Sequence, residues 1–363
     1  MPSILDPLTL RGVTARNRIW LAPMCQYSAF AGDGVPTDWH LVHLGARAAG
    51  GFGLVMAEAT AVVPEGRISP HDVGLWDDAQ VTAWKRVTDF VRGQGAVPAV
   101  QLAHAGRKAS LASPLDEGGG DPLTDAEGGW QPVGPGADPF PGLREPRALT
   151  TDEIADVVAA FAAAAGRADR AGFDVVEVHA AHGYLLHAFL SPLSNTRTDA
   201  YGGDLAGRSR FLVEVVDAIR AVWPADKPVL VRLSGTDWVE GGWTVDESAA
   251  LTETLGAHGV DLVDVSSAGN TATADIPVGP GYQVPLAARI REVSGVPTGA
   301  VGLITEAAQA QAVLDDGSAD VVLLGRVALR EPAWPLRAAH DLGVGPRAAP
   351  YPPQYHRGSW RRA

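Results

Sequence analysis

The sequence predicts one α/β domain with the fold of a (β/α)8 TIM barrel. Short apolar runs rich in β-branched residues recur along the 363 residues, and alanine-rich segments with helical periodicity lie between them. Eight such strand–helix units close most economically into a barrel, because an open doubly wound sheet would need an unusually large number of strands. We therefore expect residues 1–363 to form a single barrel domain.

The eight predicted strands in chain order cover residues 19–24, 53–59, 97–103, 174–180, 229–234, 262–267, 296–302 and 321–326. Two of the helices between them begin with capping boxes, in which Thr150 is followed by Glu153 and Thr244 by Glu247. The helix after Thr150 has apolar residues at helical spacing and is expected to end at Gly172.

One segment, residues 111–146, interrupts the alternation after the third strand and is dense in Gly, Pro and Asp. Barrels have their active sites at the C-terminal ends of the strands, so this insertion could be a lid over the site. A solvated surface insertion would have the same composition. Both interpretations stay open from the residues alone.

The composition, 46% hydrophobic and 20% charged, is typical of a folded protein. The net charge of −13 is expected to repel nucleic acid and anionic membranes. The single cysteine, Cys25, excludes an internal disulfide framework and is consistent with a reducing cytoplasm. No run approaches the roughly 20 apolar residues of a membrane span, and the first residues lack a signal-peptide pattern. We expect a cytoplasmic protein.

The most distinctive polar residues at a predicted strand end lie in "VEVHAAHGY", where His179 and His182 are followed by Tyr184. Imidazoles at this spacing could be metal ligands, donors to a substrate, or structural histidines. A catalytic zinc needs about three His, Asp, Glu or Cys ligands. The neutral Gln101 and the cationic Arg232 are expected at the same rim and disfavour a bound dication, so no metal is predicted.

Arg232 is a charged residue inside an otherwise apolar strand, and burying it requires an anionic or strongly accepting partner. That partner could be a ligand or a carboxylate of the barrel. The seventh and eighth strands end in Gly302 and Gly325, and Arg326 follows. Barrels commonly bind a phosphate at this place through backbone N–H groups.

Seven motifs, in this order and spread over nearly the whole chain, resemble those of the Old Yellow Enzyme family, in particular its thermophilic-like ene reductases. They are "APMCQYS", "EATAVVPEGR", "QLAHAGRKA", "VEVHAAHGYLLHAFLSPLSNTRTDAYGG", "RLS", "VSSAGN" and "LLGR". The resemblance implies a (β/α)8 barrel with non-covalently bound FMN. The residues it places at the flavin are Ala22, Pro23, Met24, Cys25, Ala59, Gln101 and Arg232, with Gly302, Gly325 and Arg326 at the phosphate.

For the chemistry, the resemblance implies that His179 and His182 donate hydrogen bonds to the carbonyl oxygen of an α,β-unsaturated substrate. It implies that Tyr184 protonates the α-carbon, which a tyrosine that stays protonated at neutral pH can do. Tyr27 resembles a tyrosine that also contacts the substrate oxygen, although an aromatic ring there could simply pack.

The tail, residues 347–363, contains "PPQYHRGSW" and resembles one in which an arginine, here Arg357, crosses to the active site of a neighbouring subunit. A solvated tail is the alternative. The resemblance thus implies a homodimer or homotetramer. The sequence departs from the family in its glycine-rich stretch 118–138 and in Ala268, where the family usually has glycine.

These observations predict an NADPH dehydrogenase of the ene reductase type, with NADPH as the expected hydride donor and NADH as a possible one. Its expected substrates are small activated alkenes: unsaturated ketones and aldehydes, maleimides and nitroalkenes. A reductase of xenobiotics or nitro compounds would use the same site. A metal-dependent hydrolase or lyase and a non-enzymatic flavin-binding protein are the alternatives from other classes.

Overall fold

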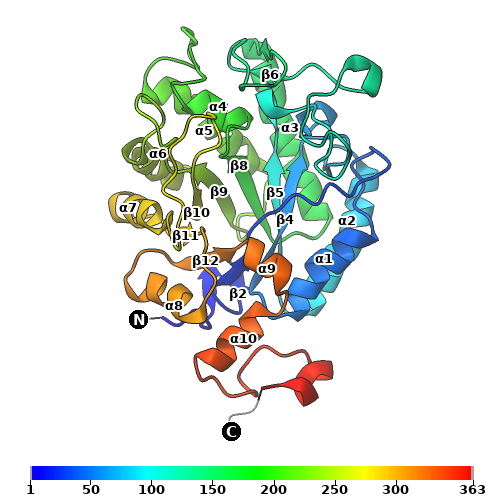
Figure 1. The fold of residues 1–363 in the computed structure, drawn as a ribbon, viewed down its shortest axis with the longest axis vertical. Helices are drawn as coiled ribbons and strands as arrows, with labels where there is room; N and C mark the ends of the chain where they lie inside the picture. Colours follow the sequence, from blue (N-terminus) through cyan, green and yellow to red (C-terminus); the bar gives the residue numbers. More distant parts are fainter. Residues whose placement is uncertain (1, 361–363) are drawn as a thin grey trace.

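The structure is a computed structural model that describes residues 2–360, and it shows eight parallel strands closed into a barrel with helices around it (Figure 1). In order around the barrel the strands are β3 (Ile19–Leu21), β4 (Leu54–Ala61), β5 (Val97–Ala103), β8 (Val175–Ala180), β9 (Val229–Ser234), β10 (Leu262–Ser266), β11 (Thr298–Ala300) and β12 (Val321–Leu324). These match the eight strands predicted from the apolar runs. The predicted (β/α)8 fold is therefore confirmed.

Three strands are shorter than predicted by two residues or more, and prolines account for two of them. β3 ends at Leu21, two residues before Pro23, and β11 begins at Thr298, directly after Pro297. Proline has no backbone N–H to donate to the neighbouring strand, so it stands at a strand end rather than inside the ladder. β12 ends at Leu324, before Gly325.

Helices cover the outside of the barrel: α1 (Asp38–Ala49), α2 (Asp78–Gly93), α3 (Thr151–Arg170), α4 (Leu185–Leu190), α5 (Leu205–Val222), α6 (Val245–Ala257), α7 (Val284–Ser294), α8 (Ala307–Asp315), α9 (Arg326–Arg330) and α10 (Trp334–Asp341). Both predicted capping boxes are present, with Thr150 Oγ1 accepting from the Glu153 N–H and Thr244 Oγ1 from the Glu247 N–H, each at 3.2 Å. The main hydrophobic core lies between these helices and the strands.

A short antiparallel hairpin, β1 (Leu8–Leu10) with β2 (Val13–Ala15), closes the N-terminal end of the barrel. Its side chains Leu8, Leu10 and Val13 pack on the cluster that fills the barrel interior around Trp20. The Gly12 N–H at its tip donates to the Asp226 carbonyl at 2.8 Å. The barrel is therefore sealed at this end, and space for a ligand remains at the other.

The insertion, residues 111–146, contains a 3₁₀ turn (Asp125–Glu127) and β6 (Val133–Gly134), which pairs with β7 (Arg147–Ala148). It contacts residues at the C-terminal ends of the strands. Trp130 packs in a cluster with Tyr27 and Tyr184, and its indole N–H donates to the Glu65 carbonyl at 2.8 Å. Phe140 lies 4.5 Å from Lys108 Nζ, measured from the ring centroid. The lid interpretation stays a prediction, and these contacts support it.

Within residues 2–360, none of the helices combines the length and the apolar character that crossing a membrane requires.

Candidate active site

The parallel register of the barrel brings Arg232 into line with residues of both neighbouring strands. Arg232 on β9 stands beside His179 on β8 and beside Asp264 on β10. Arg232 Nε lies 3.0 Å from Asp264 Oδ2, so the buried guanidinium does have a barrel carboxylate as partner. Its two Nη nitrogens make no hydrogen bond to any residue in the described part of the chain. This end of the side chain remains able to contact a ligand.

A second buried carboxyl, Glu177 on β8, lies in the same layer and accepts a hydrogen bond from Gln101 Nε2 at 2.8 Å. Burial and the nearby Asp264 carboxylate raise the pKa of Glu177 to about 8. Burial also raises the pKa of Asp264. Because one guanidinium faces two carboxyls, we infer that this pair retains a proton near neutral pH.

His179 is buried with its ring edge-on to two neighbouring rings. The ring centroid of His179 is 5.1 Å from that of His182 and 4.8 Å from that of Tyr184. The Ala181 N–H donates to His179 Nδ1 at 3.2 Å, so Nε2 carries the hydrogen of the neutral ring. Burial and Arg232 lower the pKa of His179 well below its usual value. His179 thus presents a neutral N–H donor, with no acceptor for it among residues 2–360.

His182 has the left-handed backbone conformation, with φ +61°, and is held on several sides. Its N–H donates to Ser234 Oγ at 2.9 Å, and its Nε2 lies 2.8 Å from Ser266 Oγ. Lys108 Nζ donates to the His182 carbonyl at 2.9 Å. Burial and Arg232 lower the pKa of His182 as well, so this ring is also neutral.

The turn at His182 and Gly183 packs directly against the backbone of the 268–270 loop. A Cβ on Gly183, which has φ +75°, would lie 2.2 Å from the Gly269 carbonyl oxygen, so only glycine fits there. Lys108 Nζ bridges the two segments, since it also donates to the Gly269 carbonyl at 2.9 Å. Ala268, the departure noted in the sequence, has φ +62°, a conformation that favours glycine and strains an alanine.

Tyr184 begins a small cluster of aromatic and thiol groups above the barrel. Tyr184, Tyr27, Cys25 and the insertion residue Trp130 all pack against the buried cluster of Ile68, Ala105 and Ala109. Burial raises the pKa of each of Tyr184, Tyr27 and Cys25, so all three are protonated at neutral pH. The Tyr184 hydroxyl makes no hydrogen bond to another described residue.

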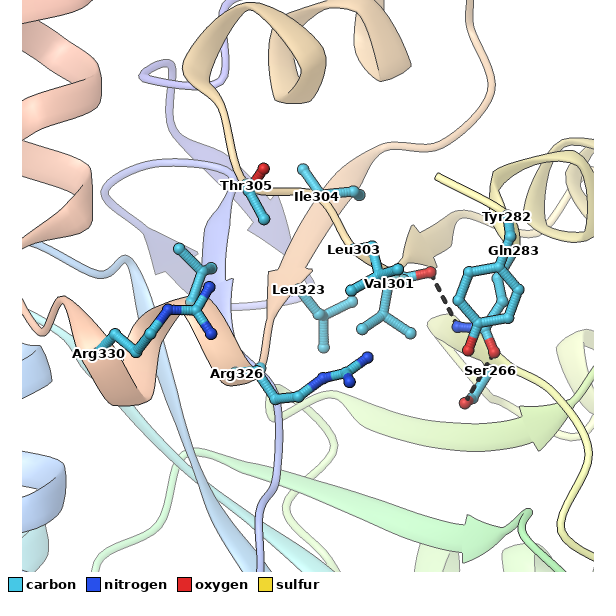
Figure 2. Close-up of a pocket in the computed structure, with 13 residues that line it drawn as sticks. Ser266, Tyr282, Gln283, Val301, Leu303, Ile304, Thr305, Leu323, Arg326 and Arg330 are labelled. Carbon is cyan, nitrogen blue, oxygen red and sulfur yellow. Dashed lines mark hydrogen bonds between the residues drawn. The ribbon is translucent and has the colours of Figure 1, made fainter. Parts of the chain in front are cut away.

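A cavity of about 230 Å³ opens beside the ends of β11 and β12 (Figure 2). Gly302, Gly325, Arg326 and Arg330 line it together with Ser266 and Gln283. Gly302 has φ +128°, a conformation that favours glycine. Figure 2 shows the Arg326 side chain extended towards Ser266 and Gln283. The predicted phosphate residues therefore do lie together in one basic pocket.

Comparison with known proteins gives the family. A family model described as "NADH:flavin oxidoreductase / NADH oxidase family" matches residues 3–344. An NADPH dehydrogenase of Geobacillus thermodenitrificans is 47% identical over 359 residues, covering 99% of this chain and 98% of the relative. The chain belongs to the NADH:flavin oxidoreductase family. The resemblance to Old Yellow Enzyme is thus confirmed, and the protein is an FMN-dependent oxidoreductase that takes its electrons from NAD(P)H.

Solved structures agree with this assignment. An Old Yellow Enzyme homologue from Zymomonas mobilis matches with a TM-score of 0.79 at 30% identity, covering 97% of this chain and 99% of that one. A 2-naphthoyl-CoA reductase complex matches with a TM-score of 0.85 at 26% identity, covering 93% of this chain. The oxidoreductase spans only 52% of that larger protein.

The residues present in the oxidoreductase fit FMN. The cavity at Gly302 and Gly325 contains two arginines that suit a phosphate, as an anion needs exposed N–H groups and positive charge. The Nη nitrogens of Arg232 have no protein partner within residues 2–360, although the side chain is only 7% exposed. A buried cation of this kind suits the electron-rich edge of a flavin.

Most of the predicted site residues in the oxidoreductase follow barrel strands and come together. Arg357 does not: it is exposed in the 3₁₀ helix Pro353–Gly358, beside α10 and far from α4 (Figure 1). Several lining residues were not singled out from the sequence, among them Ser266, Gln283 and Arg330. The motif "VSSAGN" contains Ser266 and was the available signal for it.

Asp72 is a buried carboxyl near this site and lines a small void with Tyr184. Burial raises its pKa to about 7. A raised folded-state pKa stabilises the protein below the unfolded pKa, and this stabilisation is lost as pH rises towards 7. Asparagine does not titrate, so Asp72→Asn should not lose stability in this way. We expect the difference in free energy of unfolding, variant minus unchanged oxidoreductase, to increase by on the order of 2 to 4 kcal/mol between pH 4 and pH 8. Denaturant unfolding with saturating FMN measures this, and an equal difference at both pH values would contradict it.

Proposed function

We propose that this oxidoreductase is an ene reductase that reduces the C=C bond of small activated alkenes, with NADPH as donor. The observation that supports this best is the pair of neutral imidazoles, buried His179 and half-buried His182, beside an undissociated tyrosine, Tyr184. Donors of this kind suit an oxygen on which negative charge develops, and a tyrosine suits the delivery of a proton. Bound FMN would supply the hydride that comes from NADPH.

For FMN we propose contacts from residues that lie on or just after six of the barrel strands. Ala22, Pro23, Met24, Cys25, Ala59 and Gln101 would line the ring, Arg232 would stabilise negative charge on it, and Gly302, Gly325 and Arg326 would bind the phosphate. The basic cavity and the unpaired Nη nitrogens of Arg232 support this assignment.

His179 and His182 would donate to the carbonyl oxygen of the substrate. His179 has the required hydrogen on Nε2, because its Nδ1 accepts from the Ala181 N–H. For His182 the donor would be Nδ1, which requires Ser266 Oγ to give its proton to Nε2. The 2.8 Å contact of Ser266 Oγ with His182 Nε2 is shorter than its 3.4 Å contact with Gln283 Oε1, which supports that direction.

Tyr184 would protonate the α-carbon while the two histidines hold the oxygen. Its ring stands edge-on to His179, so the proton donor and an oxygen donor are fixed to one another. Tyr27 would add a contact to the same substrate oxygen; its left-handed backbone, with φ +50°, indicates a constrained position rather than a freely packing ring.

Anaerobic half-reactions test the proposed function. The FMN-loaded protein, reduced by NADPH, should be reoxidised rapidly by enones, maleimides and nitroalkenes, with the saturated product formed. Reduction of the nitro group with the C=C bond intact would favour the nitroreductase alternative. A preparation that reoxidises with none of these compounds would overturn the proposal.

We also propose that Arg357 completes the site of a neighbouring subunit in a homodimer or homotetramer. In one chain Arg357 is exposed and lies among exposed aromatic side chains, with Tyr355 at 57% and Trp360 at 44%. Arg357→Ala should raise the KM for the alkene by about tenfold, as loss of one charged contact to substrate would. Arg347→Ala, an exposed arginine earlier in the tail, is the control and should change nothing. Unchanged kinetics and unchanged sedimentation of Arg357→Ala would remove the shared-site proposal.

A further inference from the structure

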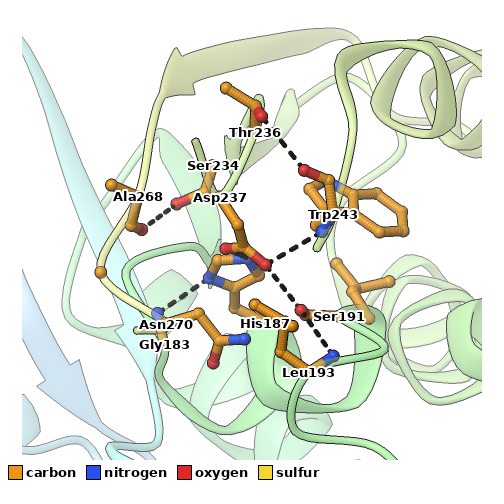
Figure 3. Close-up of polar contacts among 12 residues, drawn as sticks. Gly183, His187, Ser191, Leu193, Ser234, Thr236, Asp237, Trp243, Ala268 and Asn270 are labelled. Carbon is orange, nitrogen blue, oxygen red and sulfur yellow. Dashed lines mark hydrogen bonds and ion pairs between the residues drawn. The ribbon is translucent and has the colours of Figure 1, made fainter. Parts of the chain in front are cut away.

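A buried histidine–carboxylate pair lies next to Gly183, in the turn between His182 and Tyr184, and Figure 3 shows His187 between Gly183 and Asp237. His187 on α4 and Asp237 in the loop after β9 are both 0% exposed, and His187 Nε2 lies 3.2 Å from Asp237 Oδ1. The proposed reaction uses neither residue. A buried carboxylate beside a histidine, one helical turn from the proton donor, requires an explanation, because burying a charge is costly unless neighbouring groups stabilise it.

The hydrogen bonds around His187 define its tautomer. The Gly183 N–H donates to His187 Nδ1 at 2.8 Å, so Nδ1 holds a lone pair and the ring hydrogen is on Nε2, facing Asp237. Asp237 Oδ2 accepts from Ser191 Oγ at 2.6 Å and from the Trp243 N–H at 3.0 Å. Burial alone would raise the pKa of Asp237, but hydrogen bonds from His187 and Ser191 outweigh it and lower the pKa. The carboxylate is therefore ionised, and His187 Nε2 lies beside it, 3.2 Å from Oδ1.

The turn that His187 contacts is strained. His182 and Gly183 are two successive left-handed residues, with φ +61° and +75°. A non-glycine residue in this conformation costs on the order of 1 kcal/mol and persists only where its surroundings hold it. Ser234 Oγ binds the His182 N–H, and His187 Nδ1 binds the Gly183 N–H. Tyr184 follows at once, so its direction depends on this turn.

We propose that His187, oriented by Asp237, is a positioning residue: it holds the His182–Gly183 turn and so aims His182 and Tyr184 at the substrate. The inference rests on the roles proposed for those two residues. Nothing in it requires His187 to exchange a proton during the reaction. The proposed role depends on the direction of one hydrogen bond, in which the Gly183 N–H donates to His187 Nδ1.

Asp237→Asn tests this direction with little change of shape. The amide oxygen should stay with its two donors, Ser191 Oγ and the Trp243 N–H, which turns the NH2 group towards His187 Nε2. The ring hydrogen must then move to Nδ1, where it opposes the Gly183 N–H. We expect ¹⁵N NMR of the imidazole to show this change of tautomer, and exchange of the Gly183 amide hydrogen to accelerate by about tenfold or more.

The alkene half-reaction of Asp237→Asn should slow by roughly 10- to 100-fold, as misplacement by about 1 Å can. FMN content and flavin reduction by NADPH should change by less than about threefold. In a Tyr184→Phe background the same substitution should have a smaller effect, because the proton donor is already gone and only the aim of His182 is left to lose. Ser191→Ala is the matched control: it removes another donor to Asp237 but leaves the His187 tautomer and the half-reaction unchanged.

Equal slowing of both half-reactions, or a full additional effect in the Tyr184→Phe background, would overturn the positioning role. So would a changed tautomer with an unchanged alkene rate. If Asp237→Asn does not fold, His187→Asn and His187→Leu replace it: the asparagine oxygen can accept from Gly183 and should preserve the rate, whereas leucine should not. If Tyr184→Phe alone leaves the alkene rate intact, the proposed function fails, and the NMR and exchange measurements still decide whether His187 holds the turn.

Discussion

Tyr184→Phe is expected to slow alkene reduction by about 10²- to 10⁴-fold, the range typical of losing a general acid. The phenylalanine ring can keep the edge-on contact with His179, whose centroid is 4.8 Å away, so the loss isolates the hydroxyl. Flavin reduction by NADPH should be nearly unchanged, because that step needs no proton at the α-carbon. Stopped-flow measurement of the two half-reactions without air separates these effects.

Two controls make the result specific. The solvent isotope effect on the alkene half-reaction should fall in the variant, since proton delivery from the hydroxyl is removed. Tyr201→Phe removes the hydroxyl of a tyrosine that bonds Glu214 on the outside of the barrel, and it should leave both half-reactions intact. Equal slowing of both half-reactions in Tyr184→Phe would contradict the acid role.

His179→Phe is the second substitution with a large expected effect. It removes the Nε2–H donor, and the loss of one donor to a developing oxyanion typically costs about 10² to 10³ in rate. Phenolates present an oxygen like that of the enolate, so the affinity for phenol should fall by about 10- to 100-fold as well. Titration of the flavin absorbance with phenol measures this.

Tyr184→Phe serves as the comparison for phenol binding, because it removes the acid and leaves both imidazoles in place. Its affinity for phenol should stay within about threefold of the unchanged protein. If His179→Phe bound phenol as tightly as the unchanged protein, the oxygen-donor assignment would be wrong, whatever happened to turnover.

The barrel and the gathering of site residues could be predicted from the sequence because both follow from local patterns. Apolar runs define strands, and the parallel register then places residues that follow different strands at one rim. The predicted ranges 19–24 and 296–302 ran through Pro23 and Pro297 and were too long there, although the missing N–H of proline is a local signal for a strand end. Pattern reasoning nevertheless located His179, Arg232 and Gly302 correctly at strand ends.

The features of the site that the sequence did not predict depend on contacts between segments that are distant in the chain. Asp264 as partner of Arg232 follows from the register of β9 against β10, which no local pattern encodes. Similarly, His187 meets Asp237 across fifty positions of chain, and its tautomer depends on a backbone N–H of yet another residue, Gly183. The direction of a hydrogen bond is a property of the assembled site, so it became visible only in the structure.

The β1–β2 hairpin at the N-terminal end of the barrel limits how ligands enter and leave the site. Because β1 and β2 pack against the Trp20 cluster, the barrel is closed at its N-terminal end and open only at the C-terminal ends of its strands. Ligands therefore enter and leave through the same opening. A hydride donor and an acceptor that bind to the same surface there must bind one after the other. We therefore expect an excess of NADPH or of the proposed alkene to inhibit binding of the other.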